Sequence, residues 1–229
     1  MKTLSKAIAI ASLVSASALT AQVAQAEVEV SASVAASNMY LWRGIDLGSV
    51  VATDDAGDDT AIPGGAAAIS GDLSISMGGA YAGVWTSSGD VDDGQEYDLY
   101  AGYALEAGGV SIDASVWSYV YPSQSDSDSM FDLTEVVVSL GYAGASVTVY
   151  DNVAGDSDYQ YVALGYGMGD VSATVGQQIT DGDDYTHLDI SYAYSENLSF
   201  TASKVVAQDT NSAVEEDMHV QVVLSLPIK

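Results

Sequence analysis

Residues 110–116 read Val-Ser-Ile-Asp-Ala-Ser-Val, so apolar and polar side chains alternate at every position. Successive side chains point to opposite faces of an extended strand, whereas a helix repeats about every 3.6 residues. The same period of two recurs along the chain after residue 27, for example at 136–142 and 188–194. The pattern therefore predicts an all-β protein whose strands have one apolar and one polar face.

The alternating runs predict about twelve strands. Their expected positions are near 28–44, 66–77, 80–87, 95–105, 110–121, 131–142, 145–151, 157–166, 171–179, 184–194, 198–207 and 217–227. Every second connection is a tight turn in which Gly or Asn can adopt a positive φ angle. These turns fall at 78–79, 106–109, 143–144, 167–170 and 195–197.

The remaining connections are polar and mostly longer. Acidic loops are expected at 45–65, 88–94, 122–130 and 208–216, with shorter polar ones at 152–156 and 180–183. Short turns at one end, longer loops at the other and an even strand number are typical of outer-membrane barrels. The sequence therefore predicts a closed antiparallel transmembrane β-barrel, because open strand edges are not tolerated in lipid.

A soluble β-sandwich is the competing fold, since its strands also alternate. A sandwich would turn its polar face to water and carry mixed Lys and Glu there. Here the polar face is mainly Ser, Gly, Thr and scattered Asp, and the whole chain has only 5 Lys and Arg residues. Small polar side chains suit a crowded lumen, which favours the barrel.

The first 26 residues have the pattern of an export signal. Lys2 and Lys6 precede an apolar stretch at 7–19 that is too short to span a bilayer, and Ala24-Gln25-Ala26 is a small-x-small cleavage site. We expect residues 1–26 to be a cleaved signal peptide and residues 27–229 to form the barrel. Export through the inner membrane to the cell outer membrane follows from this interpretation.

The chain is strongly acidic, with a formal net charge of −27, and it has no cysteine. Without cysteine there is no disulfide, thiolate zinc site or thiol nucleophile. Such a charge repels nucleic acid and attracts cations, so no nucleic-acid partner is expected. If the signal peptide is removed, the basic residues that remain are Arg43, Lys204 and Lys229.

Arg43 is the only arginine, and strand parity places it on the lumen face. It either orients a solute at a constriction or pairs with a wall carboxylate such as Asp72 or Asp113. Asp189 lies on the polar face of its strand too. Arg43, Asp72, Asp113 and Asp189 are therefore the lumen or constriction candidates.

Aromatic residues fall into two groups by parity. The first group lies at apolar-face ends of strands and is expected to form an interfacial girdle: Tyr40, Trp42, Tyr142, Tyr166 and Tyr194. The second group lies on the lumen parity, where it either packs the interior or stacks against solutes: Trp85, Trp117, Tyr81, Tyr119 and Tyr121.

Acidic clusters at 54–59, 90–94 and 181–184 lack the spacing of a calcium loop. Solvated loops are the preferred interpretation, with weak divalent-cation binding, including bridges to lipopolysaccharide phosphates, as the alternative. No metal site or cofactor is expected.

The two histidines, His187 and His219, share the lumen face with Asp189 and Gln221. A serine–histidine enzyme such as an outer-membrane phospholipase needs a nucleophile beside its base, and no Gly-x-Ser-x-Gly segment occurs. The sequence therefore predicts hydrogen-bonding histidines and a protein that is not an enzyme.

Two segments carry a family resemblance: Ser-Asn-Met-Tyr-Leu-Trp-Arg-Gly-Ile at 37–45, and Gly71 followed by Gly-Ala-Tyr-Ala-Gly-Val-Trp-Thr-Ser at 79–87. In these segments the chain resembles the TorF-like porins of proteobacterial outer membranes. The resemblance implies an outer-membrane barrel of similar length with a cleaved signal peptide.

A barrel of twelve strands leaves a narrow lumen, between the filled eight-stranded and the open sixteen-stranded types. We therefore expect a porin or narrow solute channel that favours cations and admits small hydrophilic molecules, in contact with the lipid bilayer and lipopolysaccharide. The alternative is a non-conducting barrel with a structural or surface-interaction role for its acidic extracellular loops.

Overall fold

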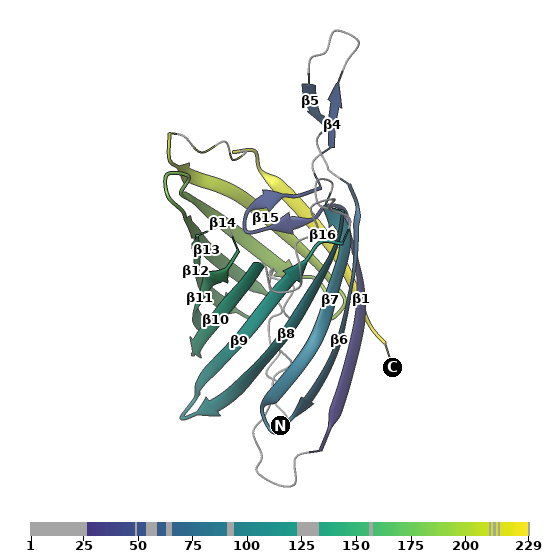
Figure 1. The fold of residues 1–229 in the computed structure, drawn as a ribbon, viewed down its shortest axis with the longest axis vertical. Coiled ribbons are helices and arrows are strands. Elements are labelled where there is room, and N and C mark those ends of the chain that lie inside the picture. The colour runs from purple at the N-terminus through teal and green to yellow at the C-terminus, as the bar shows by residue number, and fades with distance from the viewer. Residues whose placement is uncertain are drawn as a thin grey trace.

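The computed structural model describes residues 27–48, 50–53, 59–62, 66–90, 94–122, 133–155, 158–210, 212, 214 and 216–228. Within them, twelve strands form one closed antiparallel barrel (Figure 1). These strands are β1 (Glu29–Ser37), β6 (Ala68–Met77), β7 (Ala80–Asp90), β8 (Gly94–Ala107), β9 (Val110–Val120), β10 (Leu133–Tyr142), β11 (Ala145–Ala154), β12 (Gln160–Met168), β13 (Val171–Ile179), β14 (Tyr185–Ala193), β15 (Leu198–Gln208) and β16 (His219–Pro227). The predicted all-β class and closed twelve-stranded barrel are confirmed.

Two small hairpins lie between β1 and β6. One joins β2 (Leu41–Trp42) to β3 (Ile45–Asp46), and the other joins β4 (Val50–Thr53) to β5 (Asp59–Ile62). Figure 1 shows β4 and β5 extending beyond one end of the barrel. The β2–β3 hairpin instead contacts residues of the barrel wall from inside.

The barrel carries apolar residues on its outer face. Ile69, Leu164 and Ile190 are 60%, 56% and 52% exposed. The inner face buries polar residues such as Glu135, His187 and Ser203. This arrangement reverses that of a soluble protein and fits a bilayer, which solvates apolar side chains and leaves polar ones to the lumen.

The outer surface therefore contacts lipid, and the sandwich alternative is excluded. In the described part of the chain, no helix is long and apolar enough to cross a membrane.

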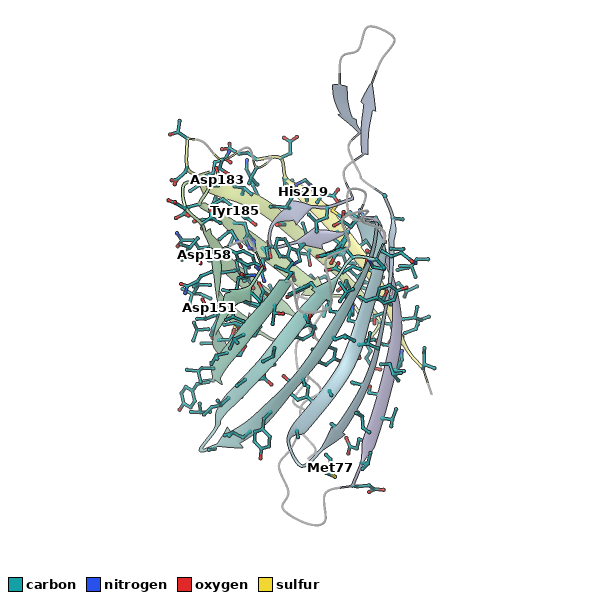
Figure 2. The ribbon with its side chains drawn as sticks, in the orientation of Figure 1. Met77, Asp151, Asp158, Asp183, Tyr185 and His219 are labelled. Atoms are coloured by element: carbon teal, nitrogen blue, oxygen red, sulfur yellow. The ribbon has the colours of Figure 1, made fainter. Side chains whose placement is uncertain are left out.

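Tight turns gather at one end of the barrel and loops at the other. Figure 2 shows Met77, beside the turn at 78–79, at the end opposite Asp158, Asp183 and His219. We call these the turn end and the loop end. The hairpin registers are continuous over most of their length, as in β9–β10, where Val110 pairs with Tyr142 and Tyr119 with Leu133.

The first and last strands close the barrel along a short seam. Residues Ser33–Ser37 of β1 pair with Val223–Pro227 of β16. Asn38 extends this seam, because its side chain donates to the Val220 carbonyl at 2.9 Å and accepts from the Val222 amide at 2.7 Å. Gln221 then donates to the Met39 carbonyl at 3.2 Å.

The first wall strand ends at Ser37, so the predicted strand at 28–44 is too long. Residues 38–40 leave the wall where Asn38 is held to β16, and the chain then turns into the lumen. The alternation continues to Trp42 because β2 is also extended, although it belongs to a hairpin and not to the wall.

A closed hydrogen-bonded barrel should resist SDS until it is heated, because no strand edge is open to unzip. We expect unboiled protein to migrate differently from boiled protein in SDS gels. A variant truncated after residue 217, which lacks β16, should lose this difference. Identical migration of boiled and unboiled wild-type protein would contradict the closed barrel.

Candidate functional site

The β2–β3 hairpin has a two-residue turn at Arg43-Gly44. Trp42 pairs with Ile45, and the Leu47 amide donates to the Tyr40 carbonyl at 2.8 Å. Both turn residues have positive φ angles, 47° for Arg43 and 88° for Gly44, as a type I′ turn requires. A positive φ is uncommon for arginine, so the turn holds Arg43 in a strained backbone conformation. The same turn places the Arg43 side chain inside the lumen.

Arg43 projects from this turn against the wall formed by β10 to β13. Its Nη2 lies 2.5 Å from Glu135 Oε1, and its Nη1 lies 3.5 Å from Gln178 Oε1. The guanidinium carbon also lies 4.7 Å from the centre of the Tyr150 ring and 4.6 Å from that of Tyr161. Arg43 thus combines an ion pair with stacking, for which a planar guanidinium is suited.

The ion pair is almost completely removed from water, since the Arg43 and Glu135 side chains are 6% and 0% exposed. Glu135 also accepts a 2.5 Å hydrogen bond from the Tyr119 hydroxyl. Burial by itself lowers the pKa of Arg43, but the Glu135 carboxylate together with Tyr119 and Tyr159 raises that pKa above its ordinary value. Arg43 therefore keeps its charge inside the lumen.

Arg43 does pair with a carboxylate of the wall, but the partner is Glu135 and not Asp72 or Asp113, the two examples named from the sequence. The hairpin directs Arg43 toward β10 to β13, whereas Asp72 and Asp113 are on β6 and β9. Tyrosines from the next strand but one hold both carboxylates: Tyr100 donates to Asp72 at 2.7 Å, and Tyr81 donates to Asp113 at 2.8 and 2.9 Å.

Asp189 is buried on β14 beside His187. The two side chains are 2.9 Å apart, and Ser203 donates to the same aspartate oxygen at 2.6 Å. His187 Nε2 lies 2.8 Å from the Tyr161 hydroxyl. A Cβ atom added to Gly44 would lie 2.6 Å from His187 Cβ, so the turn of the hairpin packs directly against this histidine.

Two of the five girdle candidates lie elsewhere, which corrects the prediction for Tyr40 and Trp42. Tyr40 is only 4% exposed and donates to Glu96, while Trp42 lies 4.3 Å from the Arg43 guanidinium. Both belong to the hairpin because the wall strand has already ended. Tyr142, Tyr166 and Tyr194 are exposed near the turn end, at 64%, 57% and 66%.

A cavity of about 180 Å³ lies between the hairpin and the lumen wall. Its acidic residues and tryptophans lie on β7 to β9 and in the hairpin, whereas its small residues lie on β11 to β13 beside Tyr150 and Tyr161. The residues are Tyr40, Leu41, Trp42, Arg43, Trp85, Glu96, Asp98, Trp117, Tyr119, Ser146, Thr148, Tyr150, Tyr161, Ala163, Gly165 and Thr174. The chain can therefore hold a small molecule against carboxylates and rings within its lumen.

Sequence reasoning missed Glu96, Asp98 and Glu135. All three are on the polar parity of predicted strands, so parity would have placed them in the lumen. Glu96 accepts hydrogen bonds from Tyr40 and, at 3.0 Å, from Tyr121. Residues 54–58 and 91–93 of the acidic clusters lie outside the described residues, and no metal-binding group of three or more His, Cys, Asp or Glu occurs within those described.

A family model described as a bacterial protein of unknown function (Gcw_chp) matches residues 21–219. The chain belongs to this family. The sequence comparison with curated proteins gave no match. Among solved structures, this Gcw_chp chain resembles outer membrane phospholipase A from Escherichia coli, with 12% identity over 87% of this chain and 92% of the other, at a TM-score of 0.42.

An active-site mutant of the same phospholipase is also similar, with 10% identity over 87% of this chain and 90% of the other, at a TM-score of 0.42. Both structures are of an enzyme, and this finding contradicts the prediction that the Gcw_chp chain is not an enzyme. At this identity the likeness concerns the barrel fold alone, and no activity is transferred from it.

Proposed function

We propose that this barrel is a narrow outer-membrane channel, a porin for small hydrophilic molecules that favours cations. The supporting observation is the balance of charge inside the lumen. Asp72, Glu96, Asp98, Asp113 and Asp189 line the wall, while Arg43, the one arginine or lysine in the described lumen, is already paired with Glu135. The remaining carboxylates raise the local concentration of cations.

The β2–β3 hairpin is the proposed constriction. It carries Arg43 and Tyr40 into the lumen, and the cavity of about 180 Å³ lies between it and wall residues that include Asp98, Ser146 and Gly165. A lumen narrowed to a cavity of this size would admit small solutes and exclude large ones.

The proposal also covers the export of the protein and its place in the outer membrane. We take residues 1–26 as the signal peptide that directs export, and residues 27–229 as the mature barrel. The resemblance of residues 37–45 and 79–87 to TorF-like porins supports the same function. The acidic loops would lie at the lipopolysaccharide surface, where divalent cations can bridge carboxylates and phosphates.

Reversal potentials in a KCl gradient test this proposal. Purified protein in a planar bilayer should favour K⁺ over Cl⁻, and more strongly at low salt, because charge is screened within roughly 10 Å at 0.1 M. Asp113→Asn, which removes a lumen charge, should lower the preference. Asp151→Asn is the matched control, since Asp151 lies on the outer parity of β11 and bonds to Gln160. Preference for Cl⁻ would contradict the proposal.

A second candidate function is a non-conducting barrel with a structural or surface role. The buried Arg43–Glu135 pair favours it, because this pair fixes the hairpin inside the lumen. A complete absence of single-channel currents from folded protein would support this candidate over the channel.

A further inference from the structure

Asp98 differs from the other carboxylates of the lumen. It faces inward from β8, is only 5% exposed, and lines the cavity. Its Oδ1 has no hydrogen-bond donor among the described residues. Asp72, Glu96, Asp113 and Glu135 each accept from a tyrosine, so the interior otherwise satisfies its acids. Buried polar atoms nearly always have a partner, and an unpartnered oxygen in a cavity marks a place for a donor.

Aromatic side chains surround this carboxylate. In the sheet register, Asp98 lies between Trp85 of β7 and Tyr119 of β9. Trp117 follows on the same face of β9 and stacks on Tyr100 with ring centres 4.3 Å apart. The ring faces of tryptophan and tyrosine carry negative potential and attract cations. A carboxylate among such rings has the composition of a site for an ammonium group.

The cavity suits an organic cation better than a metal ion. The described residues contain no cluster of three or more His, Cys, Asp or Glu that could hold a metal. Its volume of about 180 Å³ is many times the roughly 10–15 Å³ that a cavity needs to hold one water molecule. An anion would meet Glu96 and Asp98, while Arg43 is occupied by Glu135.

We propose that the cavity binds a small organic ammonium ion, with its charged group at Asp98 Oδ1 and its carbon atoms beside Trp85 and Trp117. This inference rests on the proposed channel function and names the class of solute that the channel selects. The unpartnered Asp98 oxygen inside an aromatic cavity is the observation that carries it.

Tryptophan fluorescence reports on this site directly. The chain has 3 tryptophans, and Trp42, Trp85 and Trp117 all line the cavity. Folded protein in detergent should show a saturable fluorescence change with choline as the probe. Dimethylbutanol, in which a carbon atom replaces the charged nitrogen of choline, should give none. This comparison uses wild-type protein and needs no variant.

Asp98→Asn should weaken choline binding about tenfold or more, because it removes the charge-assisted contact. Asp151→Asn is the matched control: it removes an equal charge from the outer face of β11, and it should bind choline as wild type does. Heat-dependent migration in SDS verifies that each variant is folded.

Equal responses of the wild type to choline and dimethylbutanol would overturn the inference, as would unchanged choline affinity in folded Asp98→Asn. The bilayer measurement separates the two proposals. A K⁺-selective channel that does not bind choline rejects the ammonium site alone, whereas Cl⁻ selectivity rejects the proposed cation channel.

Discussion

Replacing Arg43 with alanine is expected to lower the free energy of unfolding by about 3 kcal/mol, because breaking one side of a buried ion pair leaves the other charge without compensation. Glu135 is 0% exposed, and in the variant it keeps the Tyr119 hydroxyl but loses the guanidinium. Four rings around Arg43, those of Trp42, Tyr150, Tyr159 and Tyr161, lose their cation as well. Denaturant unfolding of the purified barrel in detergent measures the effect. Conductance should be retained, because Asn38 and Gln221 still hold the chain that leads into the hairpin.

Two further variants test whether the unpaired Glu135 charge causes the loss of stability. Lys204→Ala removes the other described basic side chain, which is exposed on the outer face of β15, and should change stability little. The double variant Arg43→Met with Glu135→Leu removes both charges, and it should be more stable than Arg43→Ala. Unchanged stability of Arg43→Ala together with altered conductance would instead assign Arg43 to the transport path.

Replacing Gly44 with valine is expected to displace the hairpin and to raise single-channel conductance. Gly44 has a φ of 88°, where a side chain costs roughly 1–2 kcal/mol. Its new Cβ would also lie 2.6 Å from both Cβ and Cγ of His187, which is fixed by Asp189 and Tyr161. The turn cannot stay in place, so the constriction should widen while the wall remains closed.

Gly182→Val is the matched control for this prediction. Gly182 has a φ of 103° in a loop-end turn, and a Cβ atom added there would meet no described atom within 4 Å. It should therefore bear similar backbone strain without a clash, and its conductance should equal that of the wild type. A folded Gly44→Val variant with wild-type conductance would show that the hairpin does not limit the pore.

The barrel itself could be predicted from sequence because lipid and lumen impose opposite chemistry on alternate residues. The run at 171–179 matches β13 in full, and the run at 198–207 differs from β15 by one residue. Glycine turns mark where each pair of strands reverses, so strand number follows from local signals. Each pair of wall strands is specified by the same local sequence pattern, which repeats along the chain.

The interior could not be predicted in the same way. Period-two alternation does not distinguish a wall strand from a short hairpin, so by this pattern alone residues 38–44 belong to the wall. Arg43-Gly44 does offer a signal, since glycine in the second position suits a type I′ turn. No local sequence signal indicates the partner of Arg43, because Glu135 is 92 residues away. Parity alone does not determine which lumen residues lie at the same height in the barrel.

The seam between β1 and β16 has a consequence for the order of assembly. Asn38 and Met39, which lead into the hairpin, are held by residues of the last strand at sequence separations of 182 to 184. Contacts this distant form late, because the intervening chain must first be brought together. We therefore expect the hairpin to take its final position only when β16 pairs with β1, so that the lumen is unobstructed before the barrel closes.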